Sequence, residues 1–334
     1  MSYSVKFMPV KKKFKAFVIE NDKEHGVRDV DLNFLMKGDV LVKVSYSSLN
    51  YKDGLAIVKK TPVIKKFPMI PGVDFSGKVI DSSHKKFKKG DKVILNGWGV
   101  GEKHFGGFSE YARVNGDWLI HLPKNLNEKN CMIIGSAGYT AALCVLELKK
   151  KVNPKDGKVI VTGASGGVGS IAVNLLSELG YYVVALSNKQ KQFLFSLGAK
   201  EVLNRNEFKP TVKPLGKQKW IGCIDTVGGD ILASVISEIK YDGIAVATGL
   251  AKSHLLNTTV YPFILRNVTL SGVDCVYASN TKRKKAWNLI EEKLNFKKLK
   301  LIQSEKNIND INNLSKKIIE GKIKGRTLIS LKKI

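Results

Sequence analysis

The chain has 334 residues, of which 43% are hydrophobic, and its 56 lysines and arginines against 29 acidic residues give a net charge of +27. The length predicts two domains, and the hydrophobic content is enough to build a sizeable core. No apolar run approaches the ~20 residues of a membrane span and no signal-peptide pattern occurs, which excludes membrane-spanning and secreted classes, so we expect a cytoplasmic protein without a membrane partner.

The positive charge is spread along the whole sequence. Lysine clusters occur in "KKKFK", "HKKFKKGDK", "TKRKKAW" and "NFKKLKL". A field of this sign attracts polyanions, including nucleic acids and phosphorylated small molecules. No aromatic-interleaved basic segment and no zinc-finger spacing points to a nucleic-acid module, so we interpret most of the charge as general surface composition.

Residues 1–135 have the pattern of a small antiparallel β-domain. Short strand-like runs ("DVLVKVSYSSLN", "FSGKVI" and "DKVILNGWGV") alternate with turns that contain glycine. This alternation predicts an antiparallel sheet that is partly closed into a barrel. Residues 279–334 read as helix, helix, turn and strand, and we expect them to return to this domain and complete it.

Residues 136–278 change to an alternation of strands and helices. In "GKVIVTGASGGVGSIAVNLLSELGYYVVALS" an apolar strand leads through a glycine-rich turn into a helix over 170–179, which ends at Gly180 and is followed by a second strand. Further strand-like runs occur in "AKEVLN", "WIGCIDTVGG", "YDGIAVATGL" and "NVTLSGVD". This succession predicts an α/β fold with a doubly wound, mainly parallel sheet.

The glycine-rich turn is a candidate dinucleotide site. Gly163, Gly166 and Gly169 are spaced G-x-x-G-x-x-G, directly after a strand and at the start of a helix. Glycines in this context let backbone amides approach a pyrophosphate, whose charge then lies at the helix N-terminus. The spacing differs from the commoner G-x-G-x-x-G form, so a purely structural turn is the alternative.

The end of the second strand indicates which dinucleotide is bound. About 20 residues after the turn, an Asp or Glu would bind the ribose hydroxyl of NAD and repel the phosphate of NADP. This chain has Ser187, Asn188 and Lys189 there, which supply two neutral donors and a cation. That set suits a phosphate, so we predict NADPH as the cofactor.

Six segments carry a family resemblance: "SSLNYKDGLA", "FPMIPGVDFSGKV", "GWGVGEKHFGGFSEYARVNGDWL", "VTGASGGVGS", "PFILRNVTLSGVD" and "GRTL". In this order they resemble the medium-chain dehydrogenase/reductase superfamily, in which a GroES-like catalytic domain precedes a Rossmann domain and then receives the chain back. Within it they look most like the zinc-free NADPH-dependent acryloyl-CoA reductases of the quinone-oxidoreductase-like branch. The resemblance implies reduction of the double bond of acryloyl-CoA to propionyl-CoA, by hydride transfer to Cβ and protonation at Cα, in a homodimer.

The same resemblance implies an enzyme without metal. Zinc enzymes of this superfamily have a cysteine ligand where this chain has "SSLNYKD" and a His-Glu pair where it has "PGVDFSG". The four cysteines are scattered singly and no Cys-x-x-Cys pair occurs. Neither a catalytic nor a structural zinc site is therefore expected.

The resemblance also implies the roles of individual residues. Asn50 and Tyr51 would be hydrogen-bond donors beside nicotinamide and substrate, where negative charge develops on the thioester oxygen, and Asp53 would organise their turn. Tyr51 would act mainly in binding and orientation, since its position contacts the cofactor in the resembling family. Coenzyme A would give the positive charge a use, since its phosphates are attracted to a lysine-rich cleft mouth. The remaining cofactor contacts are assigned to Tyr51, Ser165, Gly166, Gly167, Val168, Leu250, Ile264, Cys275 and Arg326.

Other interpretations remain open at this point. A general quinone or enone oxidoreductase that uses NADPH shares every motif. An RNA-binding protein of the quinone-oxidoreductase fold would explain the charge but gives the strand-end residues no purpose. Individual residues also have structural alternatives: Tyr51 as a packed aromatic, Lys189 as a solvated lysine and Arg326 as a surface arginine.

Overall fold

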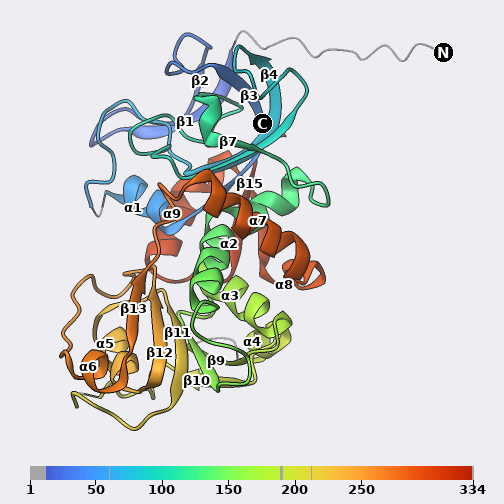
Figure 1. Cartoon of the computed structure of the whole chain (residues 1–334). Helices are drawn as coiled ribbons and strands as arrows, with labels where there is room; N and C mark the ends of the chain where they lie inside the picture. The colour runs from blue at the N-terminus through green and yellow to red at the C-terminus, as the bar shows by residue number, and fades with distance from the viewer. Residues whose placement is uncertain (1–12, 60, 189–190, 212, 333–334) are drawn as a thin grey trace.

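The computed structural model describes residues 13–59, 61–188, 191–211 and 213–332. Two large sheets lie at opposite ends of the molecule, and the helix α2 (Glu128–Leu148) runs between them (Figure 1). The chain forms the antiparallel sheet first, then the parallel sheet, and finally adds strands to the first sheet again. The α/β architecture predicted from the sequence is confirmed.

The first sheet has the order β14-β15-β3-β4-β5-β7, and β6 also pairs with β3. Its strands are antiparallel except for the pair β14 and β15. The antiparallel pairing of β15 with β3 joins the C-terminal segment to the N-terminal sheet. The strands are β3 (Val40–Leu49), β4 (Asp74–Ser82), β5 (Lys92–Asn96), β6 (Tyr111–Val114), β7 (Leu119–His121), β14 (Gln303–Asn307) and β15 (Arg326–Ser330). A separate antiparallel pair is formed by β1 (Phe14–Ile19) and β2 (His25–Val30).

The second sheet is wholly parallel and has the order β10-β9-β8-β11-β12-β13. The chain winds outward from β8 in both directions, which is the doubly wound Rossmann arrangement. In such sheets ligands bind beyond the carboxyl ends of the strands where the winding direction changes, here between β8 and β11. The strands are β8 (Lys158–Thr162), β9 (Tyr182–Ser187), β10 (Glu201–Asn204), β11 (Trp220–Asp225), β12 (Ile239–Ala247) and β13 (Thr269–Gly272).

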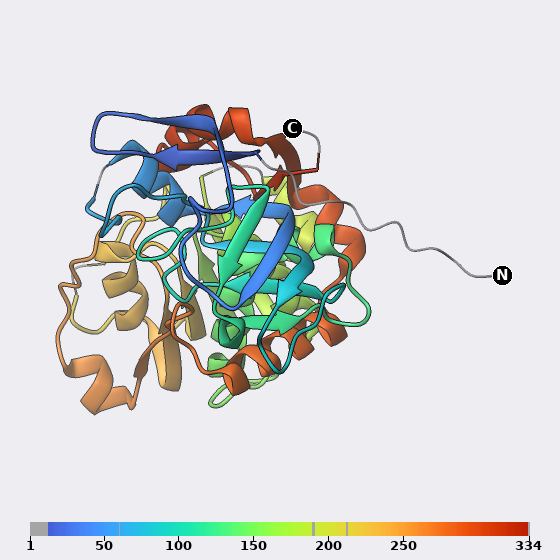
Figure 2. The same ribbon diagram turned by 90° about the horizontal axis from the view of Figure 1, so that it is seen from above.

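Helices cover both faces of the parallel sheet. One apolar cluster joins one face to α2, α3, α4 and α7, and a second joins the other face to α5. A third apolar cluster forms the core of the domain that contains the antiparallel sheet. The view from above shows α1 and α9 together on one side of that sheet (Figure 2). The helices are α1 (Tyr51–Val58), α3 (Gly167–Glu178), α4 (Lys191–Leu197), α5 (Gly229–Ser237), α6 (Tyr261–Arg266), α7 (Asn280–Lys293), α8 (Leu299–Ile302) and α9 (Ile311–Ile319), with 3₁₀ turns at Gly116–Trp118, Phe296–Lys298 and Ile308–Asp310.

The helix α2 is the one described helix that is long and apolar enough to cross a membrane, but 89% of its apolar window is buried inside the protein. It is a core helix, and its backbone is interrupted at Gly135, which has φ 54°. The predicted domain boundary at 135/136 falls on this interruption. The boundaries themselves, 1–135 with 279–334 and 136–278, stay a prediction.

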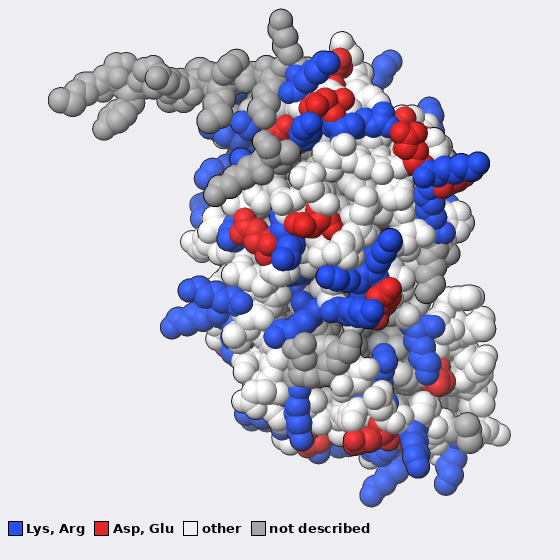
Figure 3. All heavy atoms as spheres, turned by 180° about the vertical axis from the view of Figure 1, so that it is seen from behind, with Lys and Arg blue, Asp and Glu red and all other residues white. Residues whose placement is uncertain are grey.

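The basic side chains are spread over the surface. Figure 3 shows lysines and arginines distributed over the back of the molecule, with acidic groups among them. Ion pairs such as Lys15–Asp29 and Lys129–Glu305 use a part of this charge. The distribution fits the interpretation that the charge belongs to the general surface.

Candidate functional site

A cleft of about 1130 Å³ lies between the two sheets, beyond the carboxyl ends of β8, β9 and β11. It is lined by the glycine-rich turn, by the start of α1 and by the segment that joins α9 to β15. Most of the residues predicted from the sequence meet in this one cleft. They are Asn50, Tyr51, Gly163, Ser165, Gly166, Gly167, Val168, Gly169, Ser187, Asn188, Leu250, Cys275 and Arg326.

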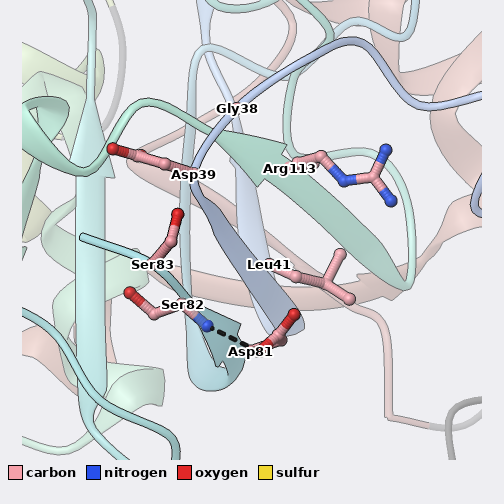
Figure 4. Close-up of a pocket in the computed structure, with 7 residues that line it drawn as sticks. All are labelled: Gly38, Asp39, Leu41, Asp81, Ser82, Ser83 and Arg113. Carbon is pink, nitrogen blue, oxygen red and sulfur yellow. Dashed lines mark hydrogen bonds between the residues drawn. The ribbon is translucent and has the colours of Figure 1, made fainter.

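A second, smaller pocket of about 170 Å³ lies in the antiparallel sheet (Figure 4). It is lined by Gly38, Asp39, Leu41, Asp81, Ser82, Ser83 and Arg113. The Asp39 carboxylate already accepts the Gly116 N–H at 2.7 Å, and the labelled polar side chains do not converge on one point. It shares no residue with the large cleft, so the chemistry of the protein is sought in the cleft.

The glycine-rich turn leaves room for an anion at the start of α3. Gly163 has φ +58°, and a Cβ there would lie 2.2 Å from Thr226 Oγ1. A Cβ on Gly169 would lie 2.4 Å from the Gly163 carbonyl oxygen, so helix and turn approach each other closely. Gly166 and Gly167 face the cleft with their backbone, and the first amides of a helix bind phosphates well. The turn therefore fits the pyrophosphate of a dinucleotide.

The end of β9 lies beside this turn. Ser187 Oγ donates to Ser165 Oγ at 2.9 Å, which ties the strand end to the glycine-rich turn. Asn188 also lines the cleft, whereas Lys189 lies outside the residues that the structure describes. No acidic side chain from this strand end lines the described part of the cleft, as the prediction of NADPH requires.

A cation that was not predicted from the sequence, Arg205, lies at this end of the cleft. Arg205 follows β10, lines the cleft, and its backbone N–H donates to the Ser187 carbonyl at 3.2 Å. Because β10 pairs in parallel with β9, the residues after both strands meet at the same edge of the sheet. A signal was therefore present in the sequence: an arginine directly after the next strand of the parallel unit.

The turn before α1 contains the predicted catalytic residues. The Asn50 amide donates to the Ser48 carbonyl and to Asp74 Oδ2, both at 3.1 Å, and Asn50 Oδ1 accepts from Arg326 Nη1 at 3.1 Å. Both the donor and the acceptor of this side-chain amide therefore have hydrogen-bond partners within the protein. The structure does not support the predicted role of Asn50 as a donor to the substrate, because its hydrogens already have buried acceptors, and it places Asn50 in the scaffold of the turn.

Tyr51 is one of the polar residues of this turn that line the cleft. It is half-buried, lines the cleft at the first position of α1, and its hydroxyl has no hydrogen-bond partner among the described residues. The hydroxyl can therefore donate to a bound molecule. This placement agrees with the role expected for Tyr51 and removes the alternative of a fully packed aromatic.

Asp53 does not line the cleft but holds the turn from behind. Its carboxylate accepts the backbone N–H groups of Asn50, Gly72 and Val73 at 2.9 to 3.1 Å. It is 1% exposed, and burial together with the nearby Asp74 carboxylate raises its pKa from 3.8 to about 7. Asp53 thus ties the start of α1 to the segment before β4, as the predicted organising role requires.

The raised pKa of Asp53 predicts how the stability depends on pH. An unfolded chain releases this proton near pH 3.8 and the folded protein near pH 7, so the stabilising effect of the protonated group is complete at low pH and is lost as pH rises to about 7. The stability advantage of wild type over Asp53→Asn should therefore shrink between pH 4 and pH 7, by up to a few kcal/mol, since each unit of pKa corresponds to about 1.4 kcal/mol. Urea unfolding of both proteins across this range measures the difference, and a constant difference would contradict the assignment.

A buried polar network lies directly below the cleft. Asp74 accepts hydrogen bonds from the Ser48 N–H at 3.0 Å, from Ser48 Oγ at 2.8 Å and from the Ser136 N–H at 2.6 Å. The Arg326 guanidinium donates to Ser48 Oγ at 2.6 Å and to the Ile133 carbonyl at 3.0 Å. Asp74 is fully buried and Arg326 is 2% exposed. Arg326 is thus a buried member of the site, and the alternative of a surface arginine is wrong.

Arg326 connects this network to the glycine-rich turn. A Cβ on Gly167, the first residue of α3, would lie 3.1 Å from Arg326 Nη1, and a Cβ on Gly135 would lie 2.4 Å from Nη2. The guanidinium therefore lies close to the backbone at both positions, where the absence of a side chain leaves room for it. Since the first turn of α3 is the expected pyrophosphate site, a cation at this place fits the same ligand.

The far wall of the cleft is only partly as predicted. Leu250 and Cys275 line it, but Ile264 lies on α6, is 68% exposed and is not a lining residue. The cleft lining thus gives no support to the assignment of Ile264 to the cofactor site, which stays a prediction. Thr226, Val227 and Thr248 take part in this wall and were not identified from the sequence.

The donor set of the cleft does not offer a metal site. Among the described residues no group of three or more His, Cys, Asp or Glu side chains lies close enough together to hold an ion. In the two segments where zinc enzymes of the resembling superfamily have ligands, Ser48 Oγ donates to the Asp74 carboxylate and accepts a hydrogen bond from Arg326.

Comparison with known proteins relates both domains to oxidoreductases. Residues 36–124 match the family described as "Alcohol dehydrogenase GroES-like domain", and residues 167–292 match the family described as "Zinc-binding dehydrogenase". The chain is 49% identical over 309 residues to the probable acrylyl-CoA reductase AcuI of Escherichia coli, a match that covers 92% of this chain and 95% of the relative.

Two further relatives extend this similarity. The acrylyl-CoA reductase AcuI of Ruegeria pomeroyi is 42% identical over 327 residues, covering 95% of this chain and 99% of the relative. The crystal structure of the yhdH oxidoreductase from Salmonella enterica in complex with NADP superimposes with a TM-score of 0.92 at 46% identity, covering 95% of this chain and 99% of that one.

Proposed function

Because this chain belongs to the medium-chain dehydrogenase/reductase superfamily, and within it to the family of the AcuI acrylyl-CoA reductases, we propose that it reduces the double bond of acryloyl-CoA with NADPH and releases propionyl-CoA. The observation that carries this proposal is the single cleft in which the glycine-rich turn and Tyr51 meet. One side of that cleft fits a dinucleotide phosphate and the other presents a free hydroxyl. Measuring NADPH oxidation with acryloyl-CoA tests the proposal directly.

The chain holds the cofactor through its backbone and through cations. The first amides of α3 and the guanidinium of Arg326 bind the pyrophosphate, and Ser187, Asn188 and Lys189 bind the 2′-phosphate together with Arg205. NADPH, when bound, supplies a hydride to the β carbon of the acyl group. Leu250 and Cys275 line the cleft and would give the nicotinamide side of the cofactor an apolar surface.

The substrate is activated by hydrogen bonds. Negative charge develops on the thioester oxygen during the reaction, and a donor aimed at that oxygen lowers the barrier. The Tyr51 hydroxyl, which lines the cleft and has no hydrogen-bond partner among the described residues, is our candidate for this donor. Leu55, Val73 and Val100 line the cleft nearby and give the acyl group an apolar surface.

Removing the Tyr51 hydroxyl should slow the reaction. In Tyr51→Phe the ring keeps its place, but the thioester oxygen loses a donor, so kcat/KM for acryloyl-CoA should fall by about ten- to a hundredfold, as expected for one hydrogen bond to a developing charge. The affinity for NADPH, measured by fluorescence titration, should change little. A variant with wild-type kcat/KM would show that another group stabilises the charge.

We also propose that the protein forms a homodimer through the edge of the parallel sheet. Within the described residues β13 pairs on one side only, with β12. Large apolar side chains near this edge are exposed: Tyr241, Leu255, Val260, Tyr261, Ile264, Leu265 and Leu270. An open strand with apolar neighbours is a typical site for pairing with a second copy. Sedimentation equilibrium at micromolar concentration tests this oligomeric state. Wild type should have the mass of a dimer, and Leu270→Lys, which places a charge on β13, should have the mass of a monomer.

A further inference from the structure

The segment 320–325, between α9 and β15, reaches from the antiparallel domain to the parallel one. All six of its residues line the cleft. Its last residue, Gly325, donates its backbone N–H to the Ser165 carbonyl in the glycine-rich turn at 3.0 Å. Gly325 has φ +61°, and a Cβ there would lie 2.2 Å from the Ile302 carbonyl oxygen. The backbone of this segment is therefore held in place at the phosphate end of the cleft.

Lys324 is the basic side chain that this segment brings to the parallel domain. Its Nζ lies 4.3 Å from the centre of the Phe193 ring on α4, a cation–π contact between the two domains. Lys324 is exposed and has no ion-pair partner among the described residues. Its ammonium group thus has a defined position and its charge is not neutralised by a carboxylate.

The other lysines of the cleft differ in this respect. Lys322 pairs with Glu320 at 2.7 Å, and Lys252 pairs with Asp230 at 2.6 Å. Lys52 pairs with Glu102. Each of these charges is balanced by a neighbouring carboxylate. Among the described lysines that line the cleft, Lys324 is the one without such a partner, so it can pair with a bound anion.

The contacts of the segment place Lys324 at the adenosine end of the cleft. Its neighbour Gly325 contacts Ser165, and Ser165 contacts Ser187 at the end of β9. Arg205 lines the same end from the parallel domain. A phosphate bound at this end would therefore lie near cations of both domains, which raises its affinity beyond what the strand end alone can supply.

We propose that Lys324 determines specificity for a ribose phosphomonoester at the strand end, by binding the 2′-phosphate of NADPH from across the cleft. This assignment rests on the proposed function and names a residue of its cofactor site that the family motifs do not contain. The 3′-phosphate of coenzyme A has the same chemistry. The bond of the adjacent Gly325 to Ser165 and the contact of Lys324 with Phe193, on the helix that follows β9, favour the 2′-phosphate.

The test measures binding of nucleotide fragments, so it does not depend on turnover. Adenosine 2′,5′-bisphosphate and 5′-AMP are titrated calorimetrically into wild type, Lys324→Gln, Lys324→Arg and the matched control Lys322→Gln. The bisphosphate should bind Lys324→Gln about five- to tenfold more weakly, since one partly screened charge is lost, and 5′-AMP should bind as before. Lys324→Arg should retain affinity, and Lys322→Gln should match wild type.

Salt provides a second readout that a purely structural role would not change. The difference in affinity for adenosine 2′,5′-bisphosphate between wild type and Lys324→Gln should become smaller as ionic strength rises, because salt screens a direct contact between lysine and phosphate. Equal weakening of both nucleotides, or none, would overturn the proposal. Titration of coenzyme A and 3′-dephospho-coenzyme A forms the last arm: if Lys324→Gln weakens only coenzyme A, the lysine serves the substrate phosphate and the proposal is wrong. A protein that fails to reduce acryloyl-CoA but still discriminates the two nucleotides would refute the proposed function and leave this inference standing.

Discussion

Replacing Arg326 by methionine should reduce the affinity for NADPH about ten- to a hundredfold. The guanidinium lies between the buried Asp74 network and the first turn of α3. Its positive charge is therefore close to the expected pyrophosphate site. A charge-assisted contact to phosphate of this kind is worth about 1.5–3 kcal/mol. Fluorescence titration with NADPH measures the loss, and NADH should lose the same factor because both cofactors carry the pyrophosphate.

The same change should also destabilise the protein, and a second variant separates the two effects. In the single variant the buried Asp74 carboxylate loses the nearby Arg326 guanidinium. Removing the partner of a buried charge lowers the free energy of unfolding by about 3–5 kcal/mol. The double variant Asp74→Asn with Arg326→Met removes both charges and should recover much of that stability, but not the affinity for NADPH. Recovery of cofactor binding in the double variant would show that Arg326 acts only through the fold.

Acyl chain length should have the other large effect. Tyr51, Leu55, Val73 and Val100 line the cleft, and we expect the acyl group of the proposed substrate to lie against them. A site adapted to a three-carbon acyl group would lose complementarity with each added methylene. Discrimination from one methylene is typically about 1–3 kcal/mol, so crotonyl-CoA should have a kcat/KM roughly ten- to two-hundredfold below that of acryloyl-CoA. Steady-state rates with both thioesters at fixed NADPH measure the ratio. A ratio near one would indicate a general enoyl thioester or enone reductase.

The parallel domain was readily predicted because its signals are local. The strand, the G-x-x-G-x-x-G turn and the second strand follow one another within about 30 residues, and the structure forms them as β8, the turn into α3, and β9. The predicted helix over 170–179 begins three residues earlier, at Gly167, because the glycines of the turn already adopt the first helical positions. The cofactor residues in this unit accordingly meet in the cleft.

The site as a whole depends on contacts between distant parts of the chain, which no local pattern reveals. Arg326 meets Ser48 and Asn50 only because β15 pairs with β3. The hydrogen bond from Arg326 to Asn50 is therefore a long-range contact, and it makes Asn50 part of the scaffold of the turn. Similarly, Arg205 reaches the strand end through the pairing of β10 with β9, and Ile264 is carried away from the cleft by α6.

The fate of a deuterium label tests the central claim most directly. The enzyme is supplied with NADPH that carries deuterium at the transferred C4 position, in ordinary water, with acryloyl-CoA and a simple benzoquinone in parallel reactions. We expect acryloyl-CoA to be consumed with the higher kcat/KM, and mass analysis to find one deuterium, at the β carbon of propionyl-CoA. A benzoquinone reduced with the higher kcat/KM, or propionyl-CoA without deuterium at the β carbon, would contradict the account.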